Sequence, residues 1–404
     1  MPAPAVIRAT LRATTQRLAE ELTQPTATAP DWQSFEWRAA MAVAVMQGIG
    51  GLLATRLAWA GPADWQAFLA EQAEQGRRRE QRIRALLQAL DDEARAARLP
   101  LLGLKGAAML RHGLAPAGTR PMSDIDLLVP PGAVDHADRV IRALGYAPGV
   151  RKARHIAYEP LHAPADRAFG EHEDNPIPIE LHTAVTEPLP RRAVDITADL
   201  APHEAPAGVH GYRSKAALMR HLLLHTAGNL CTRNVRLIQL HDLSRLAPQL
   251  DSAAWAQALA PTADGRAAWW AVPTLALAAR LFPGTLPAAP VEALRACPPW
   301  LRHASAGWTL ADVSLSRLDI PWLPGVAWSQ GPADALGLAW QRLFPPEQAV
   351  TAQMLQRQHS LAGSAWTRRA PWRKALSFLC GAPPRAQTMY SLHRALAYRP
   401  SSSA

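Results

Sequence analysis

The sequence predicts an α+β protein in which a small core with a mixed sheet is flanked by helical segments on both sides. Two observations lead to this fold class. Apolar residues recur every three to four positions before residue 95 and again after residue 214, which is the period of a helix. Between these regions, residues 99–185 are typical of short strands and helices in the order β-α-β-α-β-β. The expected segments are 1–95, helical; 96–190, the α/β core; 191–300, a helical hairpin region; and 301–404, a C-terminal helical region ending in the disordered tail "YRPSSSA".

The N-terminal segment is expected to contain two long helices. The stretches "WRAAMAVAVMQGIGGLLATRLAWA" (37–60) and "RRREQRIRALLQALDDEARAARL" (77–99) have helical spacing, and "GPAD" separates them. In the second stretch one face would be lined by Ile83, Leu86, Leu87 and Leu90.

The core follows at Leu99, where the hydrophobic pattern changes. Expected strands are "LPLLGLK" (99–105), "SDIDLLV" (123–129), "RHIAYEPL" (154–161) and "IPIELHTAV" (177–185). A short helix, "AAMLRH", and a longer one, "PPGAVDHADRVIRALGY", connect the first three strands, and the longer helix would bury Val134, Ala137, Ile141 and Leu144. Beyond the core, "SKAALMRHLLLHTAGNL" and "NVRLIQLHDLSRLAPQL" predict a helical hairpin.

The composition excludes several classes of protein. With 49% hydrophobic and 19% charged residues, the chain is too apolar for a disordered protein. Its most apolar stretch is interrupted by Pro273 and Arg280, so we expect no transmembrane segment, and the first residues lack the apolar core of a signal peptide. A cytoplasmic location is therefore expected. The spacing of Cys231, Cys297 and Cys380 indicates neither disulfides nor zinc, so reduced thiols are expected.

The net charge of +10 is compatible with nucleic-acid binding but does not require it. Thirty-nine arginines and only four lysines are spread along the whole chain, a usage typical of a GC-rich genome. No specific nucleic-acid motif accompanies them. A basic nucleic-acid-binding protein is therefore the less favoured interpretation.

Two aspartates stand inside the apolar run "SDIDLLV". Side chains alternate along a strand, so Ile125, Leu127 and Val129 would share the core face, while Asp124 and Asp126 would project together from the other. Two adjacent carboxylates repel unless a cation lies between them, and Mg²⁺, or alternatively Mn²⁺, is the expected ion. Solvated aspartates at the end of an edge strand are the alternative.

Two further features favour the metal site. In "IPIELHTAV", Glu180 and His182 would share one face, which adds a third carboxylate on a neighbouring strand. Lys105 and Gly106 join a strand to a short helix, where a glycine and a helix N-terminus favour a phosphate. Arg120, just before the aspartate strand, is a further candidate for phosphate binding.

The stretch "LPLLGLKGAAMLRHGLAPAGTRPMSDIDLLV", the later "LGY" and "IELH" resemble the nucleotidyltransferases of the DNA polymerase β superfamily, and most closely a bacterial nucleotidyltransferase family within it. The resemblance covers about residues 80–250. Compared with the wider superfamily, a Lys-Gly turn replaces Gly-Gly or Gly-Ser, and the gap between Gly106 and Asp124 is longer. The role of the additional loop "HGLAPAGTR" is left open.

The resemblance implies a reaction and a role for each matching residue. A nucleoside monophosphate would pass from a nucleoside triphosphate, expected to be ATP, to an acceptor hydroxyl, with two metal ions at the reacting phosphate. The acceptor would be a small molecule, a peptide, a protein or an RNA end. The implied metal ligands and catalytic groups are Asp124, Asp126 and Glu180. The implied nucleotide-binding residues are Lys105, Gly106, Arg120 and Ser123. An inactive nucleotide-binding or scaffold protein of the same fold is the main alternative.

Three secondary candidates lie close to this set in the predicted fold. His182 shares a face with Glu180, and either a contact with substrate or an ordinary hydrogen bond would explain it. His225 and Asp242 coincide with polar positions of the helical hairpin and would either line the pocket or bond between helices. His221 and His225 have a spacing that can bind zinc, but no glutamate lies between them. The acidic stretch "GEHEDN" is expected to be a solvated loop.

Overall fold

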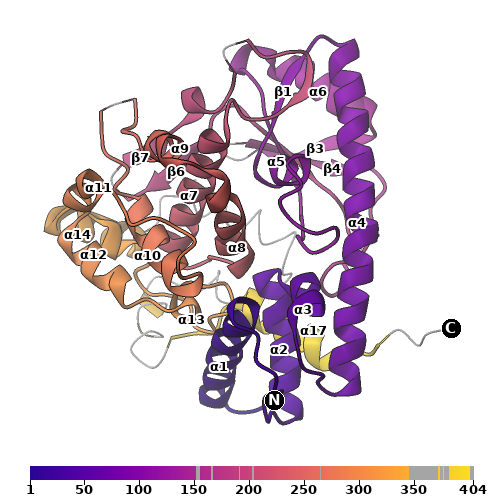
Figure 1. Cartoon of the computed structure of the whole chain (residues 1–404), viewed down its shortest axis with the longest axis vertical. Helices are drawn as coiled ribbons and strands as arrows, with labels where there is room; N and C mark the ends of the chain where they lie inside the picture. Colours follow the sequence, from indigo (N-terminus) through magenta and orange to yellow (C-terminus); the bar gives the residue numbers. More distant parts are fainter. Residues whose placement is uncertain are drawn as a thin grey trace.

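The computed structural model describes residues 1–151, 155–164, 167–190, 192–202, 204–263, 265–344 and 382–400, together with residues 372, 373 and 376. Figure 1 shows a sheet region beside the upper part of one long helix, a helical group at the foot of that helix, and further helices on the opposite side. This arrangement confirms the α+β fold class with helical segments on both sides of the core. The segment boundaries drawn from the sequence stay a prediction.

The N-terminal segment is helical, as predicted, but its first long helix is broken. Gly48 adopts a left-handed conformation with φ of 67° and ends one helix, and the next runs at 113° to it. A β-carbon at Gly48 would also meet the Arg236 guanidinium. The expectation of one continuous helix over 37–60 was therefore wrong. The helices are α1 (Pro4–Thr23), α2 (Ser34–Gln47), α3 (Gly50–Arg56) and α4 (Ala63–Ala96).

Within the described part of the chain, six strands form one mixed sheet in the order β3-β4-β5-β2-β1-β8. Parallel pairs are β2 with β5 and β1 with β8, and the other neighbouring pairs are antiparallel. The strands are β1 (Pro100–Gly103), β2 (Ile125–Leu128), β3 (Tyr146–Arg151), β4 (His155–Pro160), β5 (Ile179–His182) and β8 (Gly208–His210).

The predicted strands and helices of the core are present, but three short strand features were missed. The edge strand β3 contains Pro148 and Gly149, which weaken a strand pattern. The three-residue strand β8 lies in the stretch expected to be helical. A separate two-stranded hairpin is made by β6 (Thr186–Leu189) and β7 (Arg192–Asp195).

One face of the sheet is buried against α4 and α6 (Val134–Ala143). Ile125 and Leu127 of β2 and Ile179 and Leu181 of β5 belong to a core cluster with Ile83 of α4. The predicted apolar stripes of both helices contact this cluster, which confirms them. The opposite face carries the polar residues of β2 and β5, and α5 (Lys105–Arg111) and α7 (Lys215–Thr232) lie toward it.

The remaining helices form a second, larger core with the N-terminal helices. The predicted hairpin is present as α7 and α8 (Leu237–Leu246). After it come α9 (Ser252–Ala258), α10 (Ala271–Leu281), α11 (Val291–Ala296), α12 (Pro299–Ala306), α13 (Leu310–Val313), α14 (Pro332–Leu343) and α17 (Ala386–Ala397). The last of these returns to pack against α2 (Figure 1).

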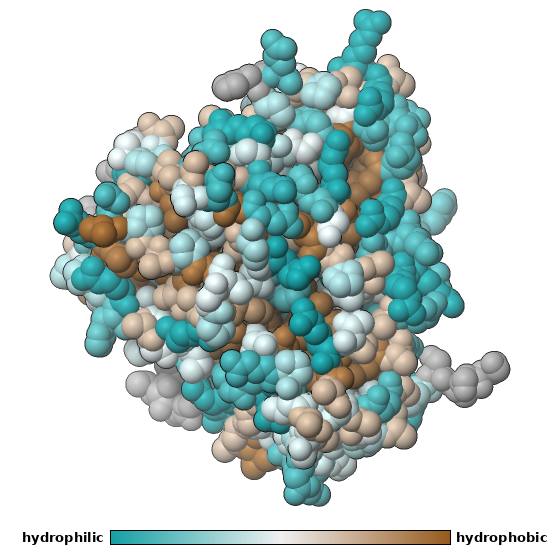
Figure 2. Space-filling view, in the orientation of Figure 1, coloured by the Kyte–Doolittle hydropathy of each residue, from teal (hydrophilic) through white to brown (hydrophobic). Residues whose placement is uncertain are grey.

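The surface differs between the two sides of the molecule. Figure 2 shows hydrophilic side chains along the edge formed by α4 and hydrophobic ones near α11 and α14 on the other side, where Leu336 and Trp340 are exposed. Among the described helices none is both long and apolar enough to span a membrane by itself, although the bent pair α2–α3 passes that test as a unit.

Two expectations from the sequence concern the cysteines, expected to be reduced thiols, and the C-terminal tail, expected to be disordered. Cys231 and Cys297 are buried and free, and burial raises the pKa of each thiol. Cys380 lies outside the described residues. The tail was expected to be disordered from Tyr398, but that side chain packs on Phe68 with ring centroids 5.6 Å apart. Residues 401–404 of the tail lie outside the described residues.

Candidate active site

Two predicted carboxylates lie side by side on neighbouring parallel strands. In the register of β2 and β5, Asp126 is paired with Glu180 and Leu128 with His182. Paired positions on adjacent strands project to the same face of a sheet. Asp126 and Glu180 therefore point together toward α5 and α7, away from the core that contains Ile125. The predicted alternation is confirmed for Asp126 and Glu180, whereas Asp124 lies just before β2, which begins at Ile125.

Asp126 is buried between two positively charged or protonatable groups. The Lys105 Nζ donates to Asp126 Oδ1 over 2.8 Å, and the His182 Nε2 lies 2.9 Å from the same oxygen. Burial alone would raise the pKa of Asp126, but Lys105 and His182 outweigh it and hold this pKa well below its ordinary range. Burial likewise opposes the charge on Lys105, yet the nearby aspartates raise its pKa overall. Asp126 is thus a carboxylate that stays ionised.

Asp124 is in a different electrostatic position although it is only two residues away. It accepts a hydrogen bond from Ser123 Oγ over 3.1 Å, and it has no ion pair of its own among the described residues. Burial, followed by the charge of Asp126, raises the pKa of Asp124 to about 6. The two aspartates therefore differ: one is neutralised by Lys105, and the other is an excess negative charge that a cation would stabilise.

The variant Asp124→Asn is expected to stabilise the metal-free protein near neutral pH. Because the folded-state pKa lies above the ordinary value of 3.8, this carboxyl favours folding at acidic pH and loses that contribution as the pH rises through about 6. The difference between these two pKa values corresponds to about 3 kcal/mol in the free energy of unfolding at high pH. In EDTA, the variant should melt above the wild type at about pH 8 and close to it at about pH 4. An equal difference at both pH values would contradict this origin.

The turn before α5 places Lys105 in a strained conformation that a tyrosine supports. Lys105 has a φ of 42°, which is unusual for a residue other than glycine, and its backbone N–H donates to the Tyr212 hydroxyl over 3.0 Å. The same hydroxyl lies 2.7 Å from His221 Nδ1 on α7. Burial, and then the charge of Lys105, hold the pKa of His221 well below its ordinary range. Tyr212, itself in contact with His221, thus holds the backbone of Lys105 in place.

Gly106 is required by close packing at the start of α5. A β-carbon there would lie 2.8 Å from Arg120 Nη1 and 2.8 Å from Met122 Cε. The guanidinium of Arg120 therefore occupies the space beside the glycine. Its Nε and Nη2 bind both carboxylate oxygens of Asp242 on α8, at 2.7–3.0 Å. Asp242 thus orients Arg120 toward the Lys105 turn.

A second arginine near Asp124 comes from the start of α8. The Arg236 Nε donates to the Met46 carbonyl over 3.0 Å. Burial lowers the pKa of Arg236, and the charges of Glu171, Arg120 and Asp124 also act on it. Two guanidinium groups therefore lie near the carboxylates.

The loop "HGLAPAGTR" has a structural role that was left open from the sequence. Gly118, with a φ of 73°, passes so close to α3 and α4 that a β-carbon on Gly51 or Gly76 would clash with its carbonyl oxygen. The Gly118 N–H donates to the buried Glu80 carboxylate over 2.7 Å. Arg120 follows two residues later. The loop therefore anchors this arginine to the long helix.

The acidic stretch "GEHEDN" is attached to α4 and is not the solvated loop that was expected. The backbone N–H of Glu171 donates to Gln72 Oε1, and that of Glu173 to Gln75 Oε1. The buried Arg79 donates to carbonyls on both sides, at Met122 and Pro176. This arginine therefore holds together the two segments that lead into β2 and β5, the strands that carry Asp126 and Glu180.

The structure separates the secondary candidates. His182 contacts Asp126 directly, and Asp242 holds Arg120, as described above. His225 lies farther along α7, where its Nδ1 is 3.6 Å from Glu187 of β6 and Asn229 bonds to its ring. Among the described residues, His221 and His225 do not form a metal-capable group with a third ligand. A zinc site at this pair is not supported.

Several residues of the site were missed from the sequence. His155 of β4 lies opposite His182 in the antiparallel register and 3.1 Å from Glu180 Oε1. Its signal was present, since "RHIAYEPL" was recognised as a strand, but nothing local showed which strand it pairs with. Tyr212 and Arg236 had no local signal, because each reaches the site only through folding.

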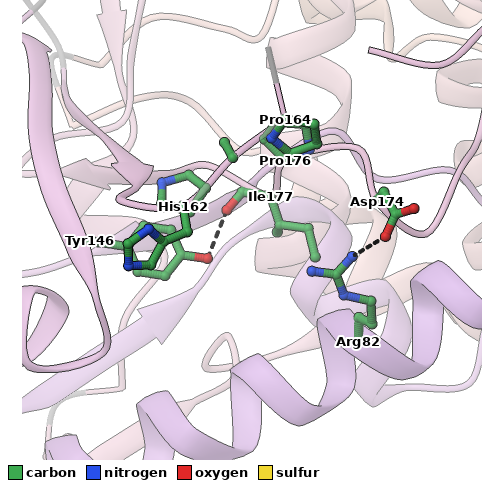
Figure 3. A pocket seen from close by; sticks show the side chains of 9 residues that line it. Arg82, Tyr146, His162, Pro164, Asp174, Pro176 and Ile177 are labelled. Carbon is green, nitrogen blue, oxygen red and sulfur yellow. Dashed lines mark hydrogen bonds and ion pairs between the residues drawn. The ribbon is translucent and has the colours of Figure 1, made fainter. Parts of the chain in front are cut away.

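Two cavities lie away from the carboxylates. One, of about 360 Å³, is bounded by α4 and the loop before β5, with Arg82, Tyr146 and Ile177 in its wall (Figure 3). The other, of about 290 Å³, lies by β8 and α5. At the carboxylates themselves, the side chains of Lys105 and Glu180 are each 19% exposed and that of Asp126 is 7% exposed. Asp126 is therefore largely covered, and Lys105 is one of the side chains in direct contact with it.

Comparison with known proteins bears on this arrangement. Residues 33–283, from the start of α2 to the end of α10, match the sequence model of a family described as "Uncharacterised nucleotidyltransferase". The chain belongs to this nucleotidyltransferase family. The match is wider than the stretch recognised from its motifs, because it includes α2, α3 and α10.

Other comparisons add little to the family assignment. The nucleotidyltransferase is similar to a solved structure titled "Solution Structure of Antibiotic-Resistance Factor ANT(2'')-Ia Reveals Substrate-Regulated Conformation Dynamics", at 14% identity and a TM-score of 0.30. That similarity covers 44% of this chain and 88% of the other. At these values it carries no argument about substrate. The comparison with curated proteins found no match.

Proposed function

We propose that this family member transfers a nucleoside monophosphate from a nucleoside triphosphate, expected to be ATP, to an acceptor hydroxyl. The proposal rests mainly on the pairing of Asp126 with Glu180 on adjacent strands, next to Lys105. Asp124 adds a third carboxylate whose raised pKa indicates unbalanced negative charge. Asp124 interacts electrostatically with Asp126 and Glu180, although the ligand atoms of these three carboxylates do not meet within 4.8 Å as those of a metal-capable group do. Brought together by an ion, they would provide oxygen ligands, and the nearby lysine and two arginines would provide cationic groups for phosphates.

The donor chemistry and charge of the three carboxylates suit a divalent metal ion, although their ligand atoms would have to move closer together to bind one. Lys105 is the cation that compensates Asp126 in this structure, whereas Asp124 has none of its own among the described residues. Asp124, Asp126 and Glu180 would hold Mg²⁺, or alternatively Mn²⁺. When bound, such ions would neutralise phosphate charge and stabilise the attacking and leaving oxygens.

The protein's own side chains would bind the phosphates and accept the proton of the acceptor. Lys105 would turn from Asp126 to the triphosphate, and Arg120, held by Asp242, would bind a phosphate with its remaining Nη1 donor. Glu180 would accept the proton of the acceptor hydroxyl. The hydroxyl oxygen then forms a bond to the α-phosphorus while the bond to the pyrophosphate oxygen breaks, so that pyrophosphate leaves.

Calorimetry tests the proposal directly. ATP, GTP, CTP and UTP are titrated into the full chain with Mg²⁺ and with EDTA, and the same is done for Asp124→Asn. The matched control is Asp135→Asn, because Asp135 is exposed on α6 beyond the opposite face of the sheet. We expect one nucleotide to bind in a Mg²⁺-dependent manner, and we expect Asp124→Asn but not the control to abolish this binding.

Other outcomes would support the alternatives. Nucleotide binding that needs no metal and survives Asp124→Asn would indicate a catalytically inactive nucleotide-binding or scaffold protein. Salt-sensitive RNA binding that survives the same substitution would favour the nucleic-acid interpretation. No binding of any nucleotide by the wild type would overturn the proposal.

A further inference from the structure

Two histidines and a glutamate converge on one face of the sheet, next to the carboxylates described above. In the antiparallel register of β4 and β5, His155 is opposite His182 and Ala157 is opposite Glu180. All four side chains therefore project to the same face. One ligand atom each from His155, Glu180 and His182 lies within 4.8 Å of the others.

His155 has a polar atom that the protein itself does not satisfy. Its Nε2 is buried, and among the described residues it has no hydrogen-bond partner. The atom lies 3.1 Å from Glu180 Oε1, but in a geometry that does not make a hydrogen bond. A buried imidazole nitrogen without a partner is costly, and such groups in native structures often mark an ion or a reactive site.

The spacing of the cluster is close to that of atoms bound to a single ion, and only a small movement of one histidine would complete it. Metal bonds of about 2.0–2.2 Å at tetrahedral or right angles place two ligand atoms roughly 3–3.5 Å apart. The His155 Nε2 to Glu180 Oε1 distance of 3.1 Å falls in this range, and the His182 Nε2 to Glu180 Oε2 distance is 3.7 Å. The two imidazole rings are 4.9 Å apart and tilted by 47°, so neither blocks the other.

The donor set distinguishes among metals. Mg²⁺ prefers oxygen ligands and keeps much of its water, whereas imidazole nitrogen favours first-row transition metals such as Co²⁺ and Zn²⁺. With two imidazoles and one carboxylate, this cluster differs from the set of Asp124, Asp126 and Glu180, which is oxygen only. Lys105 Nζ and His182 Nε2 contact the same oxygen of Asp126, so the lysine lies beside the cluster, and it is not one of the three ligand residues.

We propose that His155, Glu180 and His182 bind a first-row transition-metal ion in preference to Mg²⁺. The ion would satisfy His155 Nε2 and would release His182 from Asp126. The inference depends on the proposed function only through Glu180, which both sites share. It implies that one metal position of the enzyme is selective for a transition metal and that the other, at the aspartates, is not.

Metal titration of tag-free, chelator-treated full-length protein tests this inference. Co²⁺ is added without nucleotide, and its visible d–d absorption is followed. We expect the wild type to bind one Co²⁺ that about 10 mM Mg²⁺ does not displace and that Zn²⁺ does displace. His155→Gln and His182→Gln should each weaken Co²⁺ binding by at least about tenfold. The control His162→Gln should not, because His162 is exposed on the loop after β4.

Two results would overturn the inference. Unchanged Co²⁺ affinity in His155→Gln is one, and displacement of Co²⁺ by Mg²⁺ is the other. Because a variant could fail to fold, pulsed EPR of one equivalent of Cu²⁺, an ion that favours imidazole ligands, bound to the wild type provides a second measurement. Modulation from imidazole ¹⁴N nuclei is expected, and its absence also contradicts the inference.

The design separates this inference from the proposed function. His155→Gln should retain Mg²⁺-dependent nucleotide binding in calorimetry, because it leaves all three carboxylates in place. Nucleotide binding without a Co²⁺ site would refute only the transition-metal site. A Co²⁺ site without nucleotide binding would support the metal site and refute the proposed transfer reaction.

Discussion

Replacing Asp126 by Asn is expected to destabilise the metal-free protein, although the same change at Asp124 is expected to stabilise it. Asp126 is the common partner of Lys105 and His182, and its pKa is held well below the ordinary value because those groups outweigh its burial. A folded-state pKa below the unfolded one stabilises the protein above about pH 4, and that contribution is lost as the pH falls.

The loss should be large because Lys105 is left without its bound partner. Removing one member of a buried ion pair costs about 3–5 kcal/mol, and the retained amide oxygen of Asn places the expected loss near 3 kcal/mol. Thermal unfolding in EDTA at about pH 7 should show a lower melting temperature for Asp126→Asn than for the wild type. Both aspartate variants should lose Mg²⁺-dependent nucleotide binding.

The opposite signs make the prediction specific to the observed pairing. If Asp124 and Asp126 were equivalent solvated carboxylates, both Asn variants would have similar and small effects on stability. Equal shifts in the two variants would therefore contradict the Lys105–Asp126 pair. The double variant with Lys105→Met should recover part of the stability lost in Asp126→Asn, because it removes the uncompensated charge.

Replacing Gly76 by Ala is expected to destabilise the protein, contrary to the usual effect in a helix. Glycine inside a helix is ordinarily about 1 kcal/mol less favourable than alanine, so the substitution normally stabilises. At Gly76 the new β-carbon would clash with the carbonyl oxygen of Gly118, which is backbone and cannot rotate away. We expect a net loss of about 2 kcal/mol, in the range for overpacking a close contact.

The same substitution should also affect nucleotide binding. Gly118 is held to α4 through Glu80, and Arg120 lies two residues beyond it. Displacement of this loop would move the guanidinium that Asp242 orients, so a weaker nucleotide affinity is expected together with the lower melting temperature. Gly337→Ala is the matched control, because a β-carbon at this exposed position in α14 meets nothing within 4 Å. It should leave stability unchanged or raise it, and a stable Gly76→Ala protein would contradict the close contact.

Much of the site could be predicted because its signals are local. Strand alternation predicted that Asp126 and Ile125 project from different faces of the sheet, and likewise Glu180 and Ile179. This needed no knowledge of the partner strand. The Lys105–Gly106 turn likewise follows from a strand, a glycine and a helix that are adjacent in the sequence. The functions of Lys105, Gly106, Arg120 and Ser123 toward a nucleotide stay predictions.

Elements with weak local patterns were predicted poorly. The strand β8 has three residues, and β3 contains a proline and a glycine, so neither has enough residues of one period to be recognised. The bend after α2 was missed because the apolar pattern continues through Gly48 into α3. The helix ends because Gly48 adopts a left-handed C-cap conformation, and the approach of Arg236 shows that a side chain would not fit at that position.

The sequence by itself determined the fold class, the alternating strands and the carboxylates that they display, because each depends on neighbours along the chain. Only the tertiary structure decided that Lys105 compensates Asp126 and not Asp124, that Asp242 orients Arg120, and that His155 meets Glu180 and His182. These contacts join residues 21–122 positions apart. Charge compensation and ligand geometry depend on distances of about 3 Å, which strand pairing and helix packing set and local patterns do not.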